Sequence, residues 1–407
     1  MPVVLRNIGW LATCGAGGPP SDLQAIEHAA LVWNGPLIAW VGAERDLPEA
    51  YRAARAEDAG GRLVVPGLVD CHTHLAFGGW RADEFTDRAL GRTYAEIAEA
   101  GGGIASTVRK TRAASEAALL ARCREFLGEM VRLGVTAVEC KSGYGLTVDQ
   151  ELKLLQVYRQ LADESAATIV ATFLGAHVVP AEYRNDRDRY VAILTDELIP
   201  VIARDGLARC CDVFVERSAF TVDEARRILT AGAAAGLAPK LHADQLTDGG
   251  GALLAAEVGA WSADHLEHVS PAGIAALAAA QVVAVSLPLA SLYLRQPPMP
   301  ARRLLDAGVA VAVATDFNPG SAPSFHLPLA MTLACTMQGM TPAESLRGAT
   351  IVAARAVGLA ETHGSLEAGK RADFAVIDAP DVEHWLYHFR ANACVRTVIG
   401  GTTAWAA

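Results

Sequence analysis

The sequence lacks the features of a nucleic-acid-binding, membrane-spanning or exported protein. Its 35 Lys and Arg residues are outnumbered by 45 Asp and Glu residues, so the net charge is −10, and no basic run occurs. Such a chain has no electrostatic footprint for nucleic acid or an anionic membrane surface. No charged N-terminal segment precedes a long apolar one, so no signal peptide is expected. The most apolar stretch, 277–294, is interrupted by Gln281, Ser286 and Pro288, which favours a buried strand and its loop over a membrane span.

Cysteine pairs with the spacing of a metal or redox motif are also missing. The eight cysteines are scattered, no C-x-x-C pair occurs, and Cys210 and Cys211 are adjacent, which is poor geometry for a structural bridge. In a chain of 407 residues, this usage favours reduced thiols in a cytoplasmic protein. Apolar residues make up 52% of the chain, which is enough to bury a large core and excludes an intrinsically disordered protein.

The middle of the sequence alternates short β-branched runs with longer amphipathic stretches rich in Ala, Leu and Arg. This alternation is typical of βαβ units and a parallel sheet. Eight apolar runs occur in this region, which predicts an α/β fold, a (β/α)₈ TIM-type barrel over residues 64–363. The predicted strands cover residues 64–69, 135–138, 168–174, 212–215, 239–241, 261–263, 282–287 and 309–314.

The longest interval follows the first predicted strand and contains the Gly-rich segments 77–85 and 100–108. A long insertion after a barrel strand lies at the catalytic face, so we expect a loop that covers the substrate. The two ends of the chain, 1–63 and 364–407, show short strand patterns without helices between them. Each end has too few strands to bury a core, so we expect one small β-sandwich domain built from both. Two unrelated appendages are the alternative.

The sharpest local signal is V-D-C-H-T-H at residues 69–74, at the end of the first predicted strand. Residues two apart in a strand point the same way, so His72 and His74 project together from the carboxyl end of the barrel. An isolated H-x-H pair is more often structural. Here His242, His265 and Asp316 also close the fifth, sixth and eighth strands, and strands one, five and eight can direct side chains to one axial point. Three imidazoles and a carboxylate suit Zn²⁺ or Fe²⁺, which favours a mononuclear metal site.

Together these motifs resemble the metal-dependent amidohydrolase superfamily. The resemblance rests on VVPGLVDCHTHL, the later single His and Asp, and the closing GSLEAGKRADFAVID. It narrows to the imidazolonepropionases through FGGWRADEF, AGGGIASTV, ECKSGYGL, TFLGAH, HADQ, SADHL and TDFNPGS. The resemblance implies a hydrolase of histidine degradation that opens the lactam C–N bond of 4-imidazolone-5-propanoate, releasing N-formimidoyl-L-glutamate. It also implies one zinc or iron ion per chain and a homodimer.

The resemblance further implies individual residue roles. The metal ligands are His72, His74, His242 and Asp316. The substrate-binding residues are Arg81, Tyr144, His177, Gln245, Asn318, Gly320 and Ser321. The guanidinium of Arg81 can clamp a carboxylate tail with two parallel hydrogen bonds. Flanking glycines allow a tight loop that presents Tyr144, and the turn beyond Asp316 offers amides and a hydroxyl to a polar ligand. Taken singly, these residues also fit a solvated Arg, a packed loop aromatic, a satisfied core His177 and an ordinary turn.

Gln245 departs from part of the family, in which Glu can stand three residues after the fifth-strand His and is assigned proton transfer. An amide can orient substrate or water but cannot act as a general base near neutral pH. The predicted catalytic residues are therefore His265 and Asp316 as proton handlers, with Gln245 orienting. The hypothesis is hydrolysis by a metal-activated water that His265 orients or deprotonates.

Two other functions stay open. A related mononuclear aminohydrolase (deaminase) acting on a cytosine- or guanine-like ring would use the same metal and water but release ammonia. A catalytically inactive barrel could serve as a binding or scaffold protein, which the loss of any ligand would have favoured.

Dinuclear relatives bridge two metals with a carboxylated Lys from the fourth strand. Here that strand ends in Glu216, and Lys141 follows the second strand, which argues for one metal.

Overall fold

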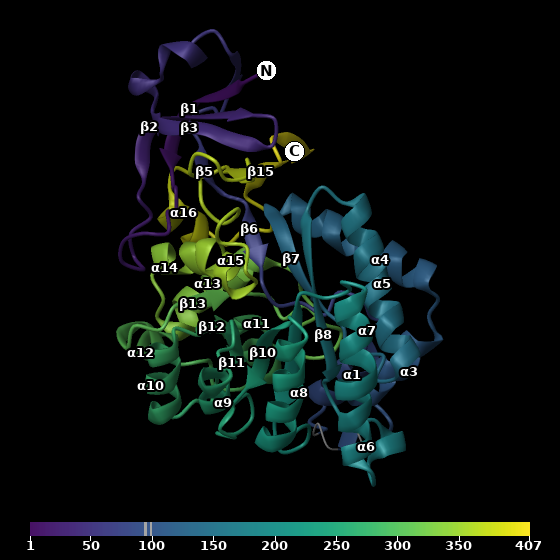
Figure 1. Cartoon of the computed structure of the whole chain (residues 1–407). Helices are drawn as coiled ribbons and strands as arrows, with labels where there is room; N and C mark the ends of the chain where they lie inside the picture. Colours follow the sequence, from purple (N-terminus) through teal and green to yellow (C-terminus); the bar gives the residue numbers. More distant parts are fainter. Residues whose placement is uncertain (93–95, 98–99) are drawn as a thin grey trace.

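The computed structural model of the chain contains a parallel barrel and a separate mixed sheet (Figure 1). The structure describes residues 1–92, 96–97 and 100–407. The barrel strands follow one another in chain order from β6 to β13, and the mixed sheet is built from both ends of the chain. The predicted fold class is therefore confirmed. Within the described residues, no helix is long and apolar enough to cross a bilayer.

The eight barrel strands lie close to the eight predicted runs. They are short and almost wholly buried, as expected for parallel strands that helices cover on the outside. Asp316 N donates to His72 O at 3.0 Å and His74 N donates to Phe317 O at 2.8 Å, which joins the last strand to the first. The strands are β6 (Leu68–Asp70), β7 (Val135–Lys141), β8 (Thr168–Ala176), β9 (Cys210–Val215), β10 (Ala238–Ala243), β11 (Ser262–His265), β12 (Val283–Ser286) and β13 (Val311–Val313).

The helices between these strands begin with strong sequence signals. Ser115 and Ser270 cap α4 and α10, and Thr221 and Thr341 begin α8 and α14 with capping boxes. The outer helices include α4 (Glu116–Arg132), α5 (Val148–Glu164), α6 (Arg187–Ala192), α7 (Ile199–Arg204), α8 (Val222–Ala234), α9 (Gly251–Glu257), α10 (Pro271–Ala280) and α12 (Ala301–Asp306). The later helices are α11 (Pro288–Leu294), α13 (Leu327–Gln338), α14 (Pro342–Gly348), α15 (Ile351–Ala356) and α16 (Val382–Tyr387).

The interval after β6 includes the helices α1 (Ala82–Ala89) and α3 (Gly103–Ala113), which precede α4. Lys153 of α5 holds the C-terminal end of α3, since its Nζ donates to the carbonyl oxygens of Thr111, Arg112 and Ala114 at 3.0–3.2 Å. The predicted covering loop is thus partly helical in its described residues, and it is anchored to the barrel's outer layer.

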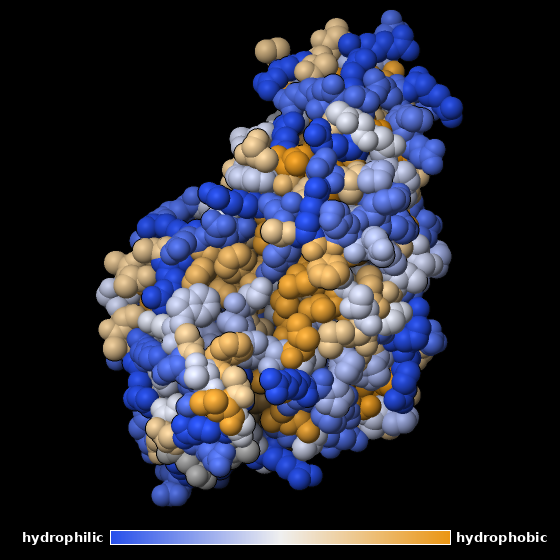
Figure 2. Space-filling view, turned by 180° about the vertical axis from the view of Figure 1, so that it is seen from behind, coloured by the Kyte–Doolittle hydropathy of each residue, from blue (hydrophilic) through white to orange (hydrophobic). Residues whose placement is uncertain are grey.

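The terminal sheet has the order β16-β15-β14-β5-β1-β2-β3, with β4 beside β1. β5 pairs antiparallel with β14, which joins the two ends of the chain, and the rings of Trp33 and Phe374 pack 5.3 Å apart in its core. Figure 2 shows that apolar side chains gather on the barrel part, below this smaller domain. The strands are β1 (Val3–Leu11), β2 (Ile26–Asn34), β3 (Leu37–Ala43), β4 (Arg55–Asp58), β5 (Leu63–Pro66), β14 (Phe374–Ile377), β15 (Cys394–Ile399) and β16 (Thr402–Ala406).

The predicted first barrel strand over 64–69 is wrong in its extent. Residues Leu63–Pro66 belong to the terminal sheet as β5, and only Leu68–Asp70 enters the barrel. Gly67 separates the two strands, and a Cβ placed there would lie 2.2 Å from the Thr136 hydroxyl oxygen. A continuous apolar run therefore serves two sheets. The domain boundaries at 63/64 and 363/364 stay predictions.

We expect Gly67→Ala to destabilise the protein by about 1–3 kcal/mol, because the methyl group must displace Thr136 or the backbone. Gly128→Ala is the matched control, since nothing lies within 4 Å of a Cβ at this exposed position of α4. There alanine should stabilise the helix by up to about 1 kcal/mol. Thermal melts of both variants check this, and equal melting temperatures would contradict the role given to Gly67.

Candidate metal centre and substrate pocket

The four predicted metal ligands converge at the carboxyl end of the barrel. His72 and His74 follow β6, His242 lies in β10 and Asp316 follows β13, and all four side chains are buried. Asp316 Oδ1 lies 3.4 Å from His72 Nε2 and 3.5 Å from His74 Nε2. His74 Nε2 in turn lies 3.5 Å from His242 Nε2. Three strand ends therefore bring these four side chains together. His72, His74 and Asp316 form one compact group of donor atoms, and His72, His242 and His265 form a second group that shares His72.

These separations fit a metal ion. In a tetrahedral site with bonds of about 2.1 Å, the ligand atoms lie about 3.4 Å from one another. His72 Nε2 is fully buried and has no hydrogen-bond partner within the described part of the chain. Such an atom is costly unless a cation or water satisfies it. The donor set, the spacing and the unpaired nitrogen together make this a candidate metal centre.

Buried carboxylates orient two of the imidazoles. The Asp264 carboxylate lies 2.6 Å from His72 Nδ1, and the Asp212 carboxylate lies 3.1 Å from His242 Nδ1. When Nδ1–H donates to a carboxylate, the Nε2 lone pair faces the opposite way, here toward the common centre. Sequence analysis did not assign this role. The available signal was an acidic residue inside a buried strand, which is rare without a partner.

A buried salt-bridge cluster lies beneath the centre. Lys141 Nζ lies 2.7 Å from Asp212, 3.1 Å from Glu139 and 3.4 Å from Asp264, and all these side chains are fully buried. Burial alone would lower the pKa of Lys141, but Asp212, Glu139 and Asp264 raise it well above its ordinary value. Lys240 adds a second cation 3.5 Å from Glu139. Lys141 is thus a charged partner of three carboxylates, and sequence analysis did not foresee this cluster.

His265 lies beside the centre at the end of β11. Its ring is 5.4 Å from that of His242 and 5.7 Å from that of His72. Its Nδ1 lies 3.6 Å from a carboxylate oxygen of Glu267. The backbone is left-handed at His265 (φ 80°) and at Asp316 (φ 55°). Such strain costs on the order of 1–3 kcal/mol per residue and is concentrated at functional sites. Here it occurs at two predicted catalytic residues.

Tyr144 and His177 line the side of the centre next to His74. The rings of His177 and His74 are stacked with centroids 5.2 Å apart, and the Tyr144 ring lies 5.7 Å from His74 and 5.4 Å from His177. Burial lowers the pKa of His177 well below its usual range, so this imidazole is neutral near pH 7. Both rings therefore contact His74, one of the predicted metal ligands, and their contact with a substrate stays a prediction.

Arg81 and Gly320 are close neighbours. Arg81 precedes α1, and its Nε lies 3.3 Å from a carboxylate oxygen of Glu84. A Cβ on Gly320 would lie 1.7 Å from Arg81 Nη2, so only glycine leaves room for this guanidinium. Arg88 of the same helix donates to Gly320 O at 3.2 Å. The two ends of the predicted pocket, at residues 81 and 320, are thus directly packed together.

The Asn318 side chain is engaged in its own turn. Its Oδ1 accepts from the backbone N–H groups of Gly320 and Ser321, both at 2.8 Å, and its Nδ2 donates to Asp316 O at 2.7 Å. The Ser321 hydroxyl lies 3.5 Å from Asp316 Oδ2. These contacts are those of a turn that orients the Asp316 carboxylate. Direct contact of Asn318 and Ser321 with a substrate stays a prediction.

Gln245 belongs to a loop whose neighbours are anchored by buried carboxylates. Glu216, at the end of β9, accepts from the N–H groups of Leu246 and Thr247 at 3.0 and 3.1 Å. Asp244 accepts from three N–H groups at the start of α9. Gln245 itself is 9% exposed, which suits a side chain in a pocket wall. Its contact with a substrate or water also stays a prediction.

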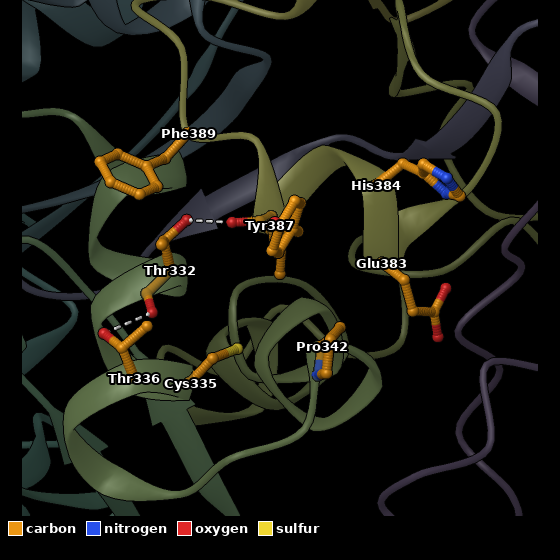
Figure 3. A pocket seen from close by; sticks show the side chains of 9 residues that line it. Thr332, Cys335, Thr336, Pro342, Glu383, His384, Tyr387 and Phe389 are labelled. Carbon is orange, nitrogen blue, oxygen red and sulfur yellow. Dashed lines mark hydrogen bonds between the residues drawn. The ribbon is translucent and has the colours of Figure 1, made fainter.

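An apolar groove lies apart from this centre, between α13, α14 and α16 (Figure 3). Within it the Thr332 hydroxyl donates to Leu386 O at 3.1 Å. None of the predicted site residues lines it. The groove residues are Thr332, Cys335, Thr336, Pro342, Glu383, His384, Leu386, Tyr387 and Phe389.

Comparison with known proteins finds a matching family and relatives that cover nearly the whole chain. Residues 63–404 match the amidohydrolase family. The imidazolonepropionase of Geobacillus kaustophilus is 48% identical over 413 residues, covering 98% of this chain and 97% of that protein. The imidazolonepropionase of Porphyromonas gingivalis W83 is 44% identical over 409 residues, with the same coverage.

Solved structures share the fold at lower identity. Guanine deaminase of E. coli is 17% identical, with a TM-score of 0.75 over 99% of each chain. An adenosine deaminase from Xanthomonas campestris with bound zinc is 19% identical, with a TM-score of 0.74 over 99% of this chain and 93% of that one.

We expect Asp264→Asn to weaken metal binding about 10–100-fold, because an amide no longer fixes the orientation of His72. Chelator competition, with the metal remaining on the protein measured at each step, checks this. Asp373→Asn is the control, because Asp373 is a buried carboxylate of the terminal domain. Equal metal loss in the two variants would contradict the orienting role of Asp264.

Proposed function

This chain belongs to the amidohydrolase family and, within it, to the imidazolonepropionases, and from this membership we propose how its buried centre works. The protein hydrolyses the lactam C–N bond of 4-imidazolone-5-propanoate and releases N-formimidoyl-L-glutamate. The observation that carries the mechanism is the convergence of three imidazole nitrogens and one carboxylate oxygen beside His265, Tyr144 and His177. The homodimer stays a prediction, which the mass of the protein in solution tests.

His72, His74, His242 and Asp316 would hold one metal ion per chain, zinc or iron, since imidazole and carboxylate ligands suit both. When bound, the ion supplies Lewis acidity that lowers the pKa of a water molecule and polarises the ring carbonyl. A single ion is supported by the fourth strand, whose terminal Glu216 holds the loop after β10. It is also supported by Lys141, whose charged ammonium is already paired with three carboxylates.

His265 is our candidate for proton transfer. It takes a proton from the attacking water and returns one to the ring nitrogen as the C–N bond breaks. A carboxylate oxygen of Glu267 lies 3.6 Å from His265 Nδ1, and its negative charge would stabilise the imidazolium that forms during this transfer. Asp316 Oδ2, beside the Ser321 hydroxyl, is a second acceptor for the same proton. Gln245 would orient the water or the ring, because an amide cannot take up a proton near neutral pH.

Arg81 is our candidate for binding the propanoate tail. Its side chain is 8% exposed, and a Glu84 carboxylate oxygen lies 3.3 Å from its Nε. Its Nη atoms can then bind a carboxylate with two parallel charge-assisted hydrogen bonds. The missing Cβ of Gly320 leaves room for the guanidinium itself. Tyr144, His177, Asn318 and Ser321 would then contact the planar ring or its polar edge.

His265→Asn should lower kcat about 10²–10⁴-fold, the usual contribution of a general acid–base group, while the metal stays bound. The assay follows loss of the ring's ultraviolet absorbance and identifies N-formimidoyl-L-glutamate; release of ammonia instead would indicate the aminohydrolase alternative. Metal content and a thermal melt exclude ligand loss and unfolding. Wild-type kcat at full metal occupancy would remove His265 from proton transfer and leave Asp316 as the candidate.

Arg81→Lys should raise KM at least tenfold despite the retained charge, because an ammonium cannot reproduce the planar fork of the guanidinium. Arg92→Lys serves as the control, because Arg92 lies in the same insertion and forms an exposed ion pair with Asp87. The two KM values, measured on ring opening, check the assignment. An Arg81→Lys enzyme with wild-type KM and kcat would exclude Arg81 from substrate binding.

A further inference from the structure

We propose that Glu151 is a positioning residue that holds Tyr144 and His177 in their places at the substrate pocket. Glu151 lies in the first turns of α5 and is fully buried. Its carboxylate faces the loop of residues 142–146, which follows β7 and carries Tyr144. No role in binding or catalysis is assigned to Glu151 itself, since it contacts backbone N–H groups and the Ser142 side chain of this loop.

The Glu151 carboxylate accepts hydrogen bonds from three N–H groups of this loop. Gly143 N lies 3.2 and 3.1 Å from its two oxygens, and Gly145 N and Leu146 N both lie 2.8 Å from Oε1. These residues flank Tyr144 on both sides. A carboxylate that accepts several backbone hydrogen bonds holds them in one direction, as an anion does in a backbone nest.

The loop conformation depends on this anion. Gly143 has φ 101° and Leu146 has φ 58°, which is unfavourable for a leucine. Both residues are buried, so their N–H groups have no access to solvent. Without the carboxylate these donors would be left unsatisfied at a cost comparable to a lost hydrogen bond each. The strained turn therefore persists because Glu151 compensates for it.

The same loop also orients His177. The Nδ1 of His177 lies 3.1 Å from Gly143 O, so Nδ1–H donates to this carbonyl and Nε2 faces away from the loop. Gly143 is thus bound at its N–H by Glu151 and at its carbonyl by His177. One buried carboxylate thereby sets the direction of two pocket side chains, Tyr144 and His177.

Arg112 of α3 holds the loop from the opposite side. Its Nε donates to Gly145 O at 2.7 Å, and its Nη1 donates to Glu182 at 2.7 Å. This guanidinium is partly exposed, so its replacement is tolerated better than that of Glu151. Arg112 also links the insertion after β6 to the Tyr144 loop. Replacing Arg112 therefore removes a hydrogen bond of that loop independently of Glu151.

Glu151 differs from the carboxylates that only begin helices. Glu344 accepts from Thr341 N in the capping box of α14 and pairs with Arg302, and neither partner is a predicted site residue. In α5 the N-cap residue Thr147 makes no side-chain capping bond, and the Glu151 carboxylate binds the preceding loop instead. A purely structural carboxylate of this kind changes stability but has no reason to change KM.

The test compares Glu151→Gln with Glu344→Gln, using ring opening of 4-imidazolone-5-propanoate as the assay. We expect Glu151→Gln to raise KM about tenfold or more, since small misplacements of binding groups are costly. Metal content should be unchanged. Glu344→Gln should lower the melting temperature and leave KM at the wild-type value. A KM increase in Glu151→Gln no larger than that in Glu344→Gln would overturn the proposal.

A double-mutant cycle tests whether Glu151 acts through Tyr144. Tyr144→Ala alone should raise KM, and adding Glu151→Gln should then raise it by a smaller factor than in the wild type. Equal factors in both backgrounds would contradict the proposal. The inference rests on the proposed function, in which Tyr144 contacts the substrate. If Tyr144→Ala leaves KM unchanged, that assignment fails, whereas an effect of Tyr144→Ala without one of Glu151→Gln overturns only the role of Glu151.

If Glu151→Gln fails to fold, the Arg112→Ala variant tests the same loop. It removes the bond to Gly145 O and should raise KM by a smaller factor than Glu151→Gln, again less so in the Tyr144→Ala background. Glu182→Ala is the matched control, because it removes the ion pair of Arg112 and leaves the bond to the loop. Equal KM changes in Arg112→Ala and Glu182→Ala would contradict the proposal.

Discussion

The hydrogen bonds that His72 donates to Asp264 and His242 donates to Asp212 determine which nitrogen of each imidazole faces the barrel axis. Both carboxylates are fully buried, and an unpaired charge at such a depth would cost several kcal/mol. Lys141 compensates for both, because its ammonium lies between them. The direction of the metal-facing atoms therefore depends on a charged cluster that must be complete. Replacing one member removes one charged partner from each of its neighbours in the cluster.

The pocket repeats this arrangement around the metal ligands. Glu84 contacts Arg81, Glu151 holds the loop of Tyr144, and Glu216 holds the loop after Gln245. In each case a buried carboxylate contacts a residue that is assigned to substrate binding, or the loop that carries it. Loops at the mouth of a barrel have few neighbours of their own to fix them, and rigid placement of binding groups requires support from behind. The barrel provides this support through acidic side chains whose partners are backbone N–H groups or a guanidinium.

Much of this organisation could be predicted from the sequence. Barrel strands are short apolar runs that end at one face, so the eight runs and the residues after them already indicated where His72, His242 and Asp316 meet. The split of the run at Gly67 was not predicted, because both halves are apolar, although the Pro66-Gly67 dipeptide is typical of a break between elements. Periodicity describes one element at a time, whereas this separation depends on a neighbouring strand.

The buried charged residues that support the site also could not be predicted from the sequence. Lys141 and Asp212 are 71 residues apart, and their pairing is visible only when β7 and β9 lie in one barrel. Asn318 shows the opposite case, since turn propensity alone explains its contacts within the 318–321 turn. Side chains that act on the substrate can be proposed from residue type and strand position. Side chains that act on other side chains require the coordinates.

The most direct test of this account is a titration of metal-stripped protein with zinc or iron(II), in which ring opening of 4-imidazolone-5-propanoate is followed at each addition. The convergence of His72, His74, His242 and Asp316 on one point predicts that activity is absent at first and rises in proportion to bound metal. It then reaches its plateau at one ion per chain. Activity in the metal-free protein, or a plateau at two ions per chain, would contradict the single-metal mechanism.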